Sequence, residues 1–111
     1  MATRCYIVDK LSETAFEAIY CHWDGYPEGV GATLASHYKT DEKVEELLRN
    51  GDLSSLGDTI KESVFYSDTE VGHPASVHKT FEEVLESAKN VGCEYVYVFA
   101  EGVWNTHKIS W

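Results

Sequence analysis

Residues 94–100, with the sequence Glu-Tyr-Val-Tyr-Val-Phe-Ala, constrain the fold of this 111-residue chain more than any other stretch. Successive side chains of a strand point to opposite faces, so the aromatic residues share one face and the aliphatic residues share the other. Because both faces are apolar, we expect a central strand. A two-residue Glu101-Gly102 turn and a returning segment at residues 103–111 predict a hairpin at this end of the chain.

Three further strands are expected. Residues 4–9 and 15–22 are rich in β-forming residues, and the short polar link at residues 10–14 reads as a hairpin connection. Residues 59–67 contain enough β-branched and aromatic residues for another strand. The polar segment at residues 52–57 is predicted to be a tight turn, and residues 68–77, which contain Gly72-His73-Pro74, a loop.

Apolar spacing and end signals predict two helices in the first half of the chain. Val30, Leu34 and Tyr38 recur at four-residue steps, which places them on one face of a helix over residues 30–38. Thr40 is suited to cap a second helix over residues 41–50. Gly51 is the expected C-terminal stop of that helix.

A third helix is expected to begin after Thr80, because Thr80 and Glu83 form the pattern of a capping box. Gly92 is its expected end. The resulting order is two strands, two helices, a strand, a helix and two strands. It predicts a single α+β domain over residues 1–111, with a mainly antiparallel sheet and the helices packed on one face.

Composition limits the partners of the chain. Nine basic and nineteen acidic residues give a formal charge of −10, which repels nucleic acid and anionic lipid. The same charge keeps a small domain soluble and also suits the approach to a basic partner. We therefore expect no direct nucleic-acid binding and no membrane binding.

The cysteines and the longest apolar run indicate the cell interior. Cys5, Cys21 and Cys93 form an odd set without CxxC spacing, so we expect reduced thiols in the core. The amino terminus lacks a signal pattern, and the run at residues 95–100 is too short to cross a bilayer. We expect a cytoplasmic protein.

The best candidate for a binding site is the loop at residues 23–31, which holds three glycines and one proline. Glycine loops that lead into a helix bring backbone amides together and attract anions. Neither a dinucleotide fingerprint nor a P-loop is present, and no Lys or Arg lies between Lys10 and Lys39. A structural loop, in which Trp23 and Tyr26 pack and Asp24 caps amides, is the alternative. The candidate ligand-binding residues are His22, Trp23, Asp24, Gly25, Tyr26, Gly29, Gly31, Ser54 and Ser55.

Catalytic and metal chemistry find little support in the sequence. His22 and Asp24 could form a general-base pair, but Cys21 should point away from His22 on a strand. Ser54 and Ser55 lack the glycine elbow of an esterase and also fit a turn. The five histidines match no standard zinc spacing. We assign no catalytic residue, no metal ligand and no cofactor.

Several motifs carry a resemblance to a known family. They are the run Tyr-Cys-His-Trp-Asp-Gly-Tyr-Pro at residues 20–27, the Gly-Val-Gly at 29–31, the run Gly-Asp-Leu-Ser-Ser-Leu-Gly at 51–57, and the closing stretch at 94–99 with Gly102 and Trp104. Together they resemble a family of small bacteriophage and prophage proteins. The resemblance implies a viral or prophage origin, and it brings no known activity or catalytic residue.

Small phage proteins that are not structural often act against host defence, so the resemblance implies a non-enzymatic counter-defence protein of the host cytoplasm. It would bind a nucleotide-derived immune signal in the loop at residues 23–31, or block a host defence protein with its acidic helix faces. The alternatives are a small nucleotide-processing enzyme that uses His22 and Asp24, and an interaction module without a small ligand. The aromatic carboxyl-terminal hairpin makes a homodimer an additional expectation.

Overall fold

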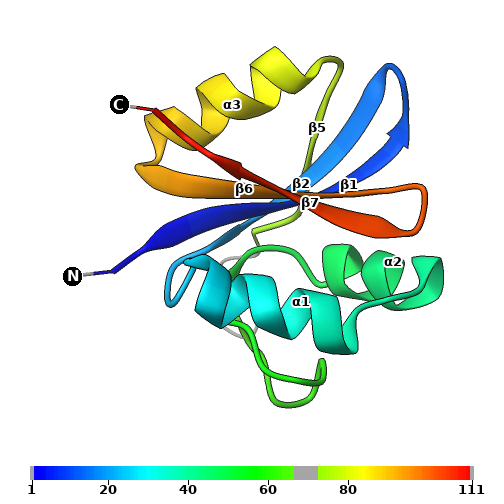
Figure 1. Ribbon diagram of the computed structural model, residues 1–111, viewed down its shortest axis with the longest axis vertical. Coiled ribbons are helices and arrows are strands. Elements are labelled where there is room, and N and C mark those ends of the chain that lie inside the picture. The colour runs from blue at the N-terminus through cyan, green and yellow to red at the C-terminus, as the bar shows by residue number, and fades with distance from the viewer. Residues whose placement is uncertain (1, 67–72, 111) are drawn as a thin grey trace.

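The computed structural model describes residues 2–66 and 73–110, and within them the chain forms one mixed sheet between helices (Figure 1). In chain order the elements are β1 (Arg4–Ser12), β2 (Ala15–Cys21), the π-helical turn η1 (Pro27–Gly31), α1 (Ala32–His37), α2 (Asp41–Arg49), β3 (Leu53–Ser55), β4 (Val64–Phe65), β5 (Ser76–His78), α3 (Phe81–Asn90), β6 (Cys93–Ala100) and β7 (Val103–Lys108).

The strand order is β4-β3-β2-β1-β6-β7, and β5 also pairs with β2. The pairs β1–β6 and β2–β3 are parallel, and the other pairs are antiparallel. The α+β class and the mostly antiparallel sheet are therefore as expected. The central position of β6 is also confirmed, because this strand lies between β1 and β7.

Helices cover both faces of the sheet, so the prediction that they pack on one face is wrong (Figure 1). Leu34, Val44 and Leu47 pack on the face that carries Ile7 and Tyr97, which we call the α1–α2 face. Val84 and Ala88 pack on the opposite face, which carries Tyr6, Val8, Val96 and Val98 and which we call the α3 face. The reason lies in β1 and β6, whose two faces are both apolar and both need cover.

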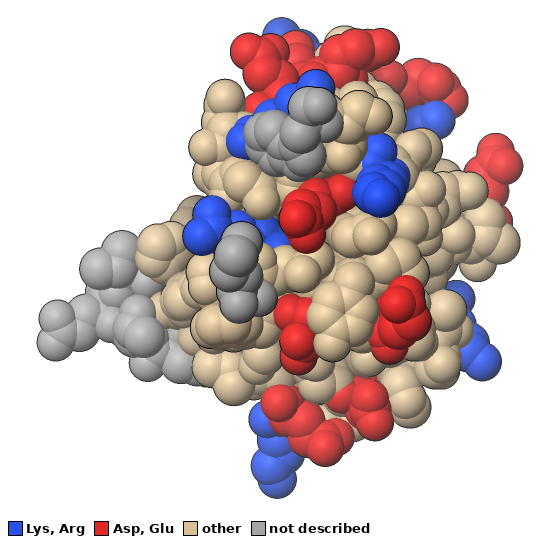
Figure 2. Space-filling view, turned by 60° about the vertical axis from the view of Figure 1, so that its left-hand side comes forward, with Lys and Arg blue, Asp and Glu red and all other residues tan. Residues whose placement is uncertain are grey.

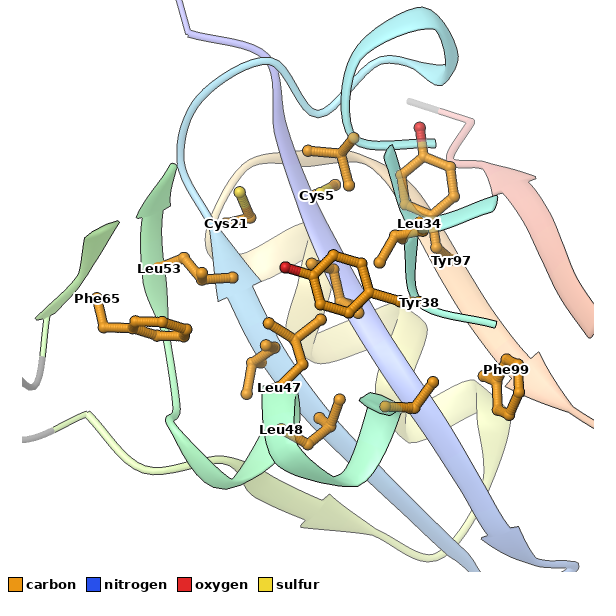
Figure 3. Packing of buried hydrophobic residues seen from close by; sticks show 14 residues of the cluster. Cys5, Cys21, Leu34, Tyr38, Leu47, Leu48, Leu53, Phe65, Tyr97 and Phe99 are labelled. Carbon is orange, nitrogen blue, oxygen red and sulfur yellow. The ribbon is translucent and has the colours of Figure 1, made fainter. Parts of the chain in front are cut away.

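Tyr38 occupies the middle of the α1–α2 face. Figure 3 shows its ring between the side chains of Leu34, Leu47 and Leu53. The Tyr38 hydroxyl donates to the carbonyl of Gly57 at 2.9 Å, so its polar atom is satisfied although the residue is buried.

The segment after α2 differs from the prediction. The expected strand at residues 59–67 is reduced to β4, because Thr59 Oγ1 accepts from the Glu62 amide at 3.2 Å and Ser63 Oγ donates to the Thr59 carbonyl at 2.9 Å. These bonds hold a turn where a strand was expected. The expected turn at residues 52–57 contains β3, and the expected loop at residues 68–77 contains the start of β5. Residues 73–75 belong to no helix or strand, as expected, and residues 68–72 of that predicted loop lie outside the described residues.

The helix starts follow the sequence closely. Thr40 Oγ1 accepts from the Lys43 amide at 3.2 Å, and Thr80 Oγ1 accepts from the Glu83 amide at 3.1 Å, as N-caps do. The Glu83 carboxylate reaches back to the amide of Lys79 at 3.1 Å instead of that of Thr80. The capping box is therefore present in a variant form.

The helix ends and the last hairpin are also confirmed. Gly51 and Gly92 follow α2 and α3 with φ of +84° and +81°, the left-handed backbone of helix stops. Glu101 and Gly102 both have positive φ, which is typical of a two-residue hairpin turn. The helix expected from Val30 begins earlier, because the π-helical turn η1 precedes α1.

The cysteines are free and buried, as expected. Cys5 and Cys21 lie opposite one another in β1 and β2 and belong to the α1–α2 face, while Cys93 belongs to the α3 face. Burial raises the pKa of Cys5 and raises that of Cys93 to about 12. Because the thiolate is the reactive form, the raised pKa values of Cys5 and Cys93 disfavour their reaction.

Candidate functional site

The predicted site loop leaves β2 and is tied at once to β3. The His22 amide donates to the Leu53 carbonyl at 3.2 Å, and the Trp23 amide donates to the Ser54 carbonyl at 3.0 Å. The structure thus brings the backbones of His22, Trp23 and Ser54 together. Ser55 lies one residue further along β3, opposite Val64 of β4.

The glycines of the loop permit close packing against the sheet. A Cβ on Gly25 would lie 2.8 Å from the Thr3 carbonyl oxygen, and a Cβ on Gly31 would lie 3.1 Å from the ring of Tyr97. The Tyr97 hydroxyl donates to the Gly25 carbonyl at 2.7 Å, and burial raises the pKa of Tyr97. A Cβ on Gly29 would collide with the Asp24 carbonyl oxygen. Packing therefore accounts for all three glycines.

Besides the Trp23 amide, three further amides of the loop donate to backbone carbonyls. The Gly25 amide donates to residue 3 at 2.8 Å, the Gly29 amide to Tyr26 at 3.0 Å, and the Val30 amide to Asp24 at 2.8 Å. Asp24 has φ of +58°, which aims its carbonyl back at the loop. An anion would need these amides free, so the loop does not offer them as a cradle.

Two large side chains of the loop remain accessible. Trp23 is 45% exposed and Tyr26 is 38% exposed, although the structural alternative placed both inside. The Tyr26 hydroxyl donates to Asp24 Oδ1 at a long 3.4 Å, and the Asp24 carboxylate raises the pKa of Tyr26. Trp23 packs edge-on against the ring of His22, with centroids 4.8 Å apart. The loop therefore presents aromatic surface to solvent.

His22 is oriented by Tyr20. Its Nδ1 lies 2.7 Å from Tyr20 Oη, and burial raises the pKa of Tyr20 to about 12, so the phenol stays protonated. The general-base hypothesis needs Asp24 to orient the imidazole, whereas Asp24 bonds to Tyr26. Cys21 belongs to the α1–α2 face, as the strand alternation predicts. The groups for a His22–Asp24 pair are thus present but engaged elsewhere.

Asp52 is a structural residue of this region that the sequence did not reveal. Its Oδ1 accepts from the Tyr20 amide at 2.9 Å, and its own amide and carbonyl bond to His73 and Tyr66. Burial raises the pKa of Asp52. Its position directly after the helix stop Gly51 was the available signal, since Asp is favoured in turns.

Among the described residues, no group of three or more His, Cys, Asp or Glu side chains is placed to hold a metal ion. In the same part of the chain, no helix has the length and apolar character needed to cross a membrane.

Acidic side chains also gather away from the loop. Figure 2 shows them at the top of the view, where α3 lies, with Lys and Arg side chains among and below them. Glu82 and Glu83 of the first turn of α3 are exposed, and so is Glu86. They form a solvated helix face that is available for a charged partner.

Comparisons with protein-family models, with curated proteins and with solved structures gave no significant match to this chain. The family resemblance therefore remains an expectation that rests on its motifs. The geometry of the loop is the basis for a functional proposal.

Proposed function

We propose that this chain is a non-enzymatic binding protein that attaches to a basic surface of another protein through its aromatic loop, residues 22–26. The observation that carries the proposal is the exposure of Trp23 at 45% and Tyr26 at 38% on a loop whose backbone is tied to two strands. Exposed aromatic side chains on a fixed backbone are typical of protein-binding surfaces.

The fixed backbone favours affinity. The Trp23 amide is bonded to β3, and the Gly25 amide and carbonyl are bonded to the segment before β1 and to β6. A loop that is ordered before binding loses less conformational entropy when a partner arrives. Trp and Tyr add an apolar body with a polar group at the tip, which suits a half-wet interface.

Charge indicates the chemistry of the partner. Asp24 and Glu28 are exposed on the same segment, and the whole chain carries a formal charge of −10. Such a surface steers a basic partner toward the loop and raises the association rate. It repels nucleotides and nucleic acid by the same physics.

The bonded amides favour a protein partner over a nucleotide-derived signal. A phosphate would need free amides or a cation, and no Lys or Arg occurs from residue 11 to residue 38. In the setting that the resemblance implies, the chain would act in the host cytoplasm by blocking a basic defence protein. This proposal keeps the effector-blocking version of the counter-defence hypothesis but assigns the contact to the aromatic loop instead of the acidic helix faces.

The test is affinity capture from a bacterial lysate with three forms of the chain. They are the unchanged chain, the double variant Trp23→Ala with Tyr26→Ala, and the control Leu11→Ala, which removes an exposed apolar side chain (54%) far from the loop. We expect the unchanged chain and the control to retain the same basic protein. The double variant should bind this protein with a Kd at least about tenfold higher. The reason is that aromatic residues at the centre of an interface contribute about 2 kcal/mol or more when they act as hot spots.

Two outcomes contradict the proposal. One is retention of the same partner by the double variant, provided that its thermal unfolding matches that of the unchanged chain. The other is the absence of any retained protein at low salt, where the charge-driven component is strongest.

A further inference from the structure

A groove of about 260 Å³ opens on the α3 face, beyond the first residue of α3. Figure 1 shows α3 over part of the sheet, while the β1–β2 and β6–β7 hairpins extend past the start of the helix. The cover of the α3 face is therefore incomplete at this end. The groove lies apart from the aromatic loop and does not depend on the function proposed for it.

Aromatic rings form much of the apolar lining. The centroids of Phe16 in β2 and Phe81 in α3 lie 6.4 Å apart with a 47° tilt, and Phe81 is 4.7 Å from the ring of His107 in β7. Val98 and Ala100 of β6 complete the apolar part. Rings from three different elements thus converge on one hollow.

Polar groups are few and lie at defined points of the lining. Lys10 Nζ is 5.9 Å from the ring centroid of Phe16, and Asn105 and His107 belong to the same groove. Lys10 Nζ lies 3.2 Å from Glu13 Oε1, but the Glu13 side chain is 90% exposed. This ion pair therefore adds little stability, and Lys10 can leave Glu13 for a ligand. A mostly apolar hollow with a few convergent polar groups is the usual composition of a small-molecule site.

Size and charge define the ligand class. A closed apolar cavity of about 150 Å³ holds benzene, so this groove has room for one aromatic ring with a short substituent. Lys10 supplies a cation, and Asn105 can donate from its amide. We propose that the groove binds a small planar aromatic carboxylate, with the ring against Phe16 and Phe81 and the carboxylate toward Lys10.

The experiment is an NMR titration of the full chain, labelled with ¹⁵N, against benzoate, benzyl alcohol and benzylammonium. We expect saturable shifts at the amides of Val98, Ala100 and Asn105, with benzoate binding at least about threefold more tightly than benzyl alcohol, because a charge-assisted bond to Lys10 is added. Benzylammonium should bind most weakly. An absence of saturable shifts, or equal affinity for the three probes, overturns the proposal.

Variants separate the groove from unspecific binding. Ala100→Leu fills the hollow and should weaken benzoate binding at least about tenfold. Lys10→Met should lower the benzoate affinity to that of benzyl alcohol. The matched control is Lys108→Met, which removes the same charge from β7 two strands away from β1, opposite Tyr95. It should bind benzoate like the unchanged chain.

The variant outcomes are decisive in either direction. Unchanged benzoate binding by a folded Ala100→Leu variant would show that the ring does not enter the groove. An equal loss in Lys10→Met and Lys108→Met would show a response to net charge alone. If Ala100→Leu fails to fold, the two lysine variants still decide the proposal.

Discussion

The two faces of the sheet are covered in different ways. On the α1–α2 face, α1 and α2 both contribute buried side chains and the core extends from Cys5 to Phe99 along the strands. On the α3 face, the core is centred under Val84 and Ala88 and gives way to a groove beyond the start of the helix. The comparison teaches that helix coverage decides whether an apolar sheet face becomes a sealed core or a hollow.

Hydrogen bonds made by side chains reinforce this difference in helix coverage. On the α1–α2 face, Trp104 Nε1 donates to the Tyr38 carbonyl at 2.8 Å, which links β7 to the end of α1. On the α3 face, Tyr6 Oη and Ser87 Oγ are bonded at 2.7 Å in the second half of the helix. That bond fixes the second half of α3 away from the groove, while the start of the helix follows β5, which pairs with β2, and carries the ring contacts of Phe81.

The largest expected change in stability follows the removal of a leucine side chain from the α1–α2 face. Leu47→Ala should lower the free energy of unfolding by about 2–5 kcal/mol, because Leu47 is fully buried and a core relaxes only partly around a deleted side chain. The same substitution on the α3 face, Leu85→Ala, removes a partly buried side chain and should cost about 1 kcal/mol. Urea unfolding measures both, and equal losses would contradict the difference between the faces.

The next largest change in stability concerns Asp9, whose buried carboxyl group lies near α2 on the α1–α2 face. Burial, together with the smaller effect of the carboxylates of Glu17, Asp41 and Glu45, raises the pKa of Asp9 to about 6. The unfolded chain ionises this group near pH 4. Its neutral form therefore stabilises the fold at low pH, and that contribution is lost as pH rises from about 4 to about 6.

Asp9→Asn should accordingly raise the free energy of unfolding at pH 7 by about 1–3 kcal/mol and give no gain near pH 4. The difference between variant and unchanged chain, followed from pH 4 to pH 8, isolates this group from other titrations. Glu94→Gln removes an equal charge from an exposed position. A gain for Glu94→Gln as large as that for Asp9→Asn would assign the effect to net charge.

The smallest expected change in stability follows the removal of a helix cap on either face of the sheet. Thr40→Ala and Thr80→Ala should each cost about 1 kcal/mol, since each removes one bond to a helix-start amide. The Thr80 variant should also shift the NMR signals of Phe81 and the groove, because Phe81 is the first residue of α3. Undisturbed groove signals would mean that ring contacts alone position the helix start.

Local features of the fold were predictable from sequence because their causes are local. The caps at Thr40 and Thr80 and the stops at Gly51 and Gly92 depend on neighbouring residues only. The central position of β6 followed from its two apolar faces. The same observation, applied consistently, excluded helices on one face alone.

Long-range pairing was not predictable. β3 joins the sheet through a single registered pair, Cys21 with Leu53, and β5 through three residues. Such short strands carry too few residues for a periodic signal, and their partners lie far away in the chain. The homodimer expected from the carboxyl-terminal hairpin stays a prediction, which light scattering on the purified chain tests.

The candidate site was found in part. The glycines marked the loop correctly, but Gly25 packs against Thr3, just before β1, and Gly31 packs against Tyr97 of β6, so distant contacts explain the glycines. The exposure of Trp23 also depends on tertiary structure. The groove had no sequence signal, since β2, α3 and β7 each contribute a ring to it.

The parallel pairing of β1 with β6 has a consequence for how the chain is made. Ile7 lies beside Tyr97, so β1 obtains this neighbour only after synthesis has passed Tyr97 and this residue has left the ribosome. Until then β1 holds its β2 hairpin partner and presents one open edge, which is a template for wrong association. Closure by so distant a strand leaves this edge of the nascent chain vulnerable until β6 has been made.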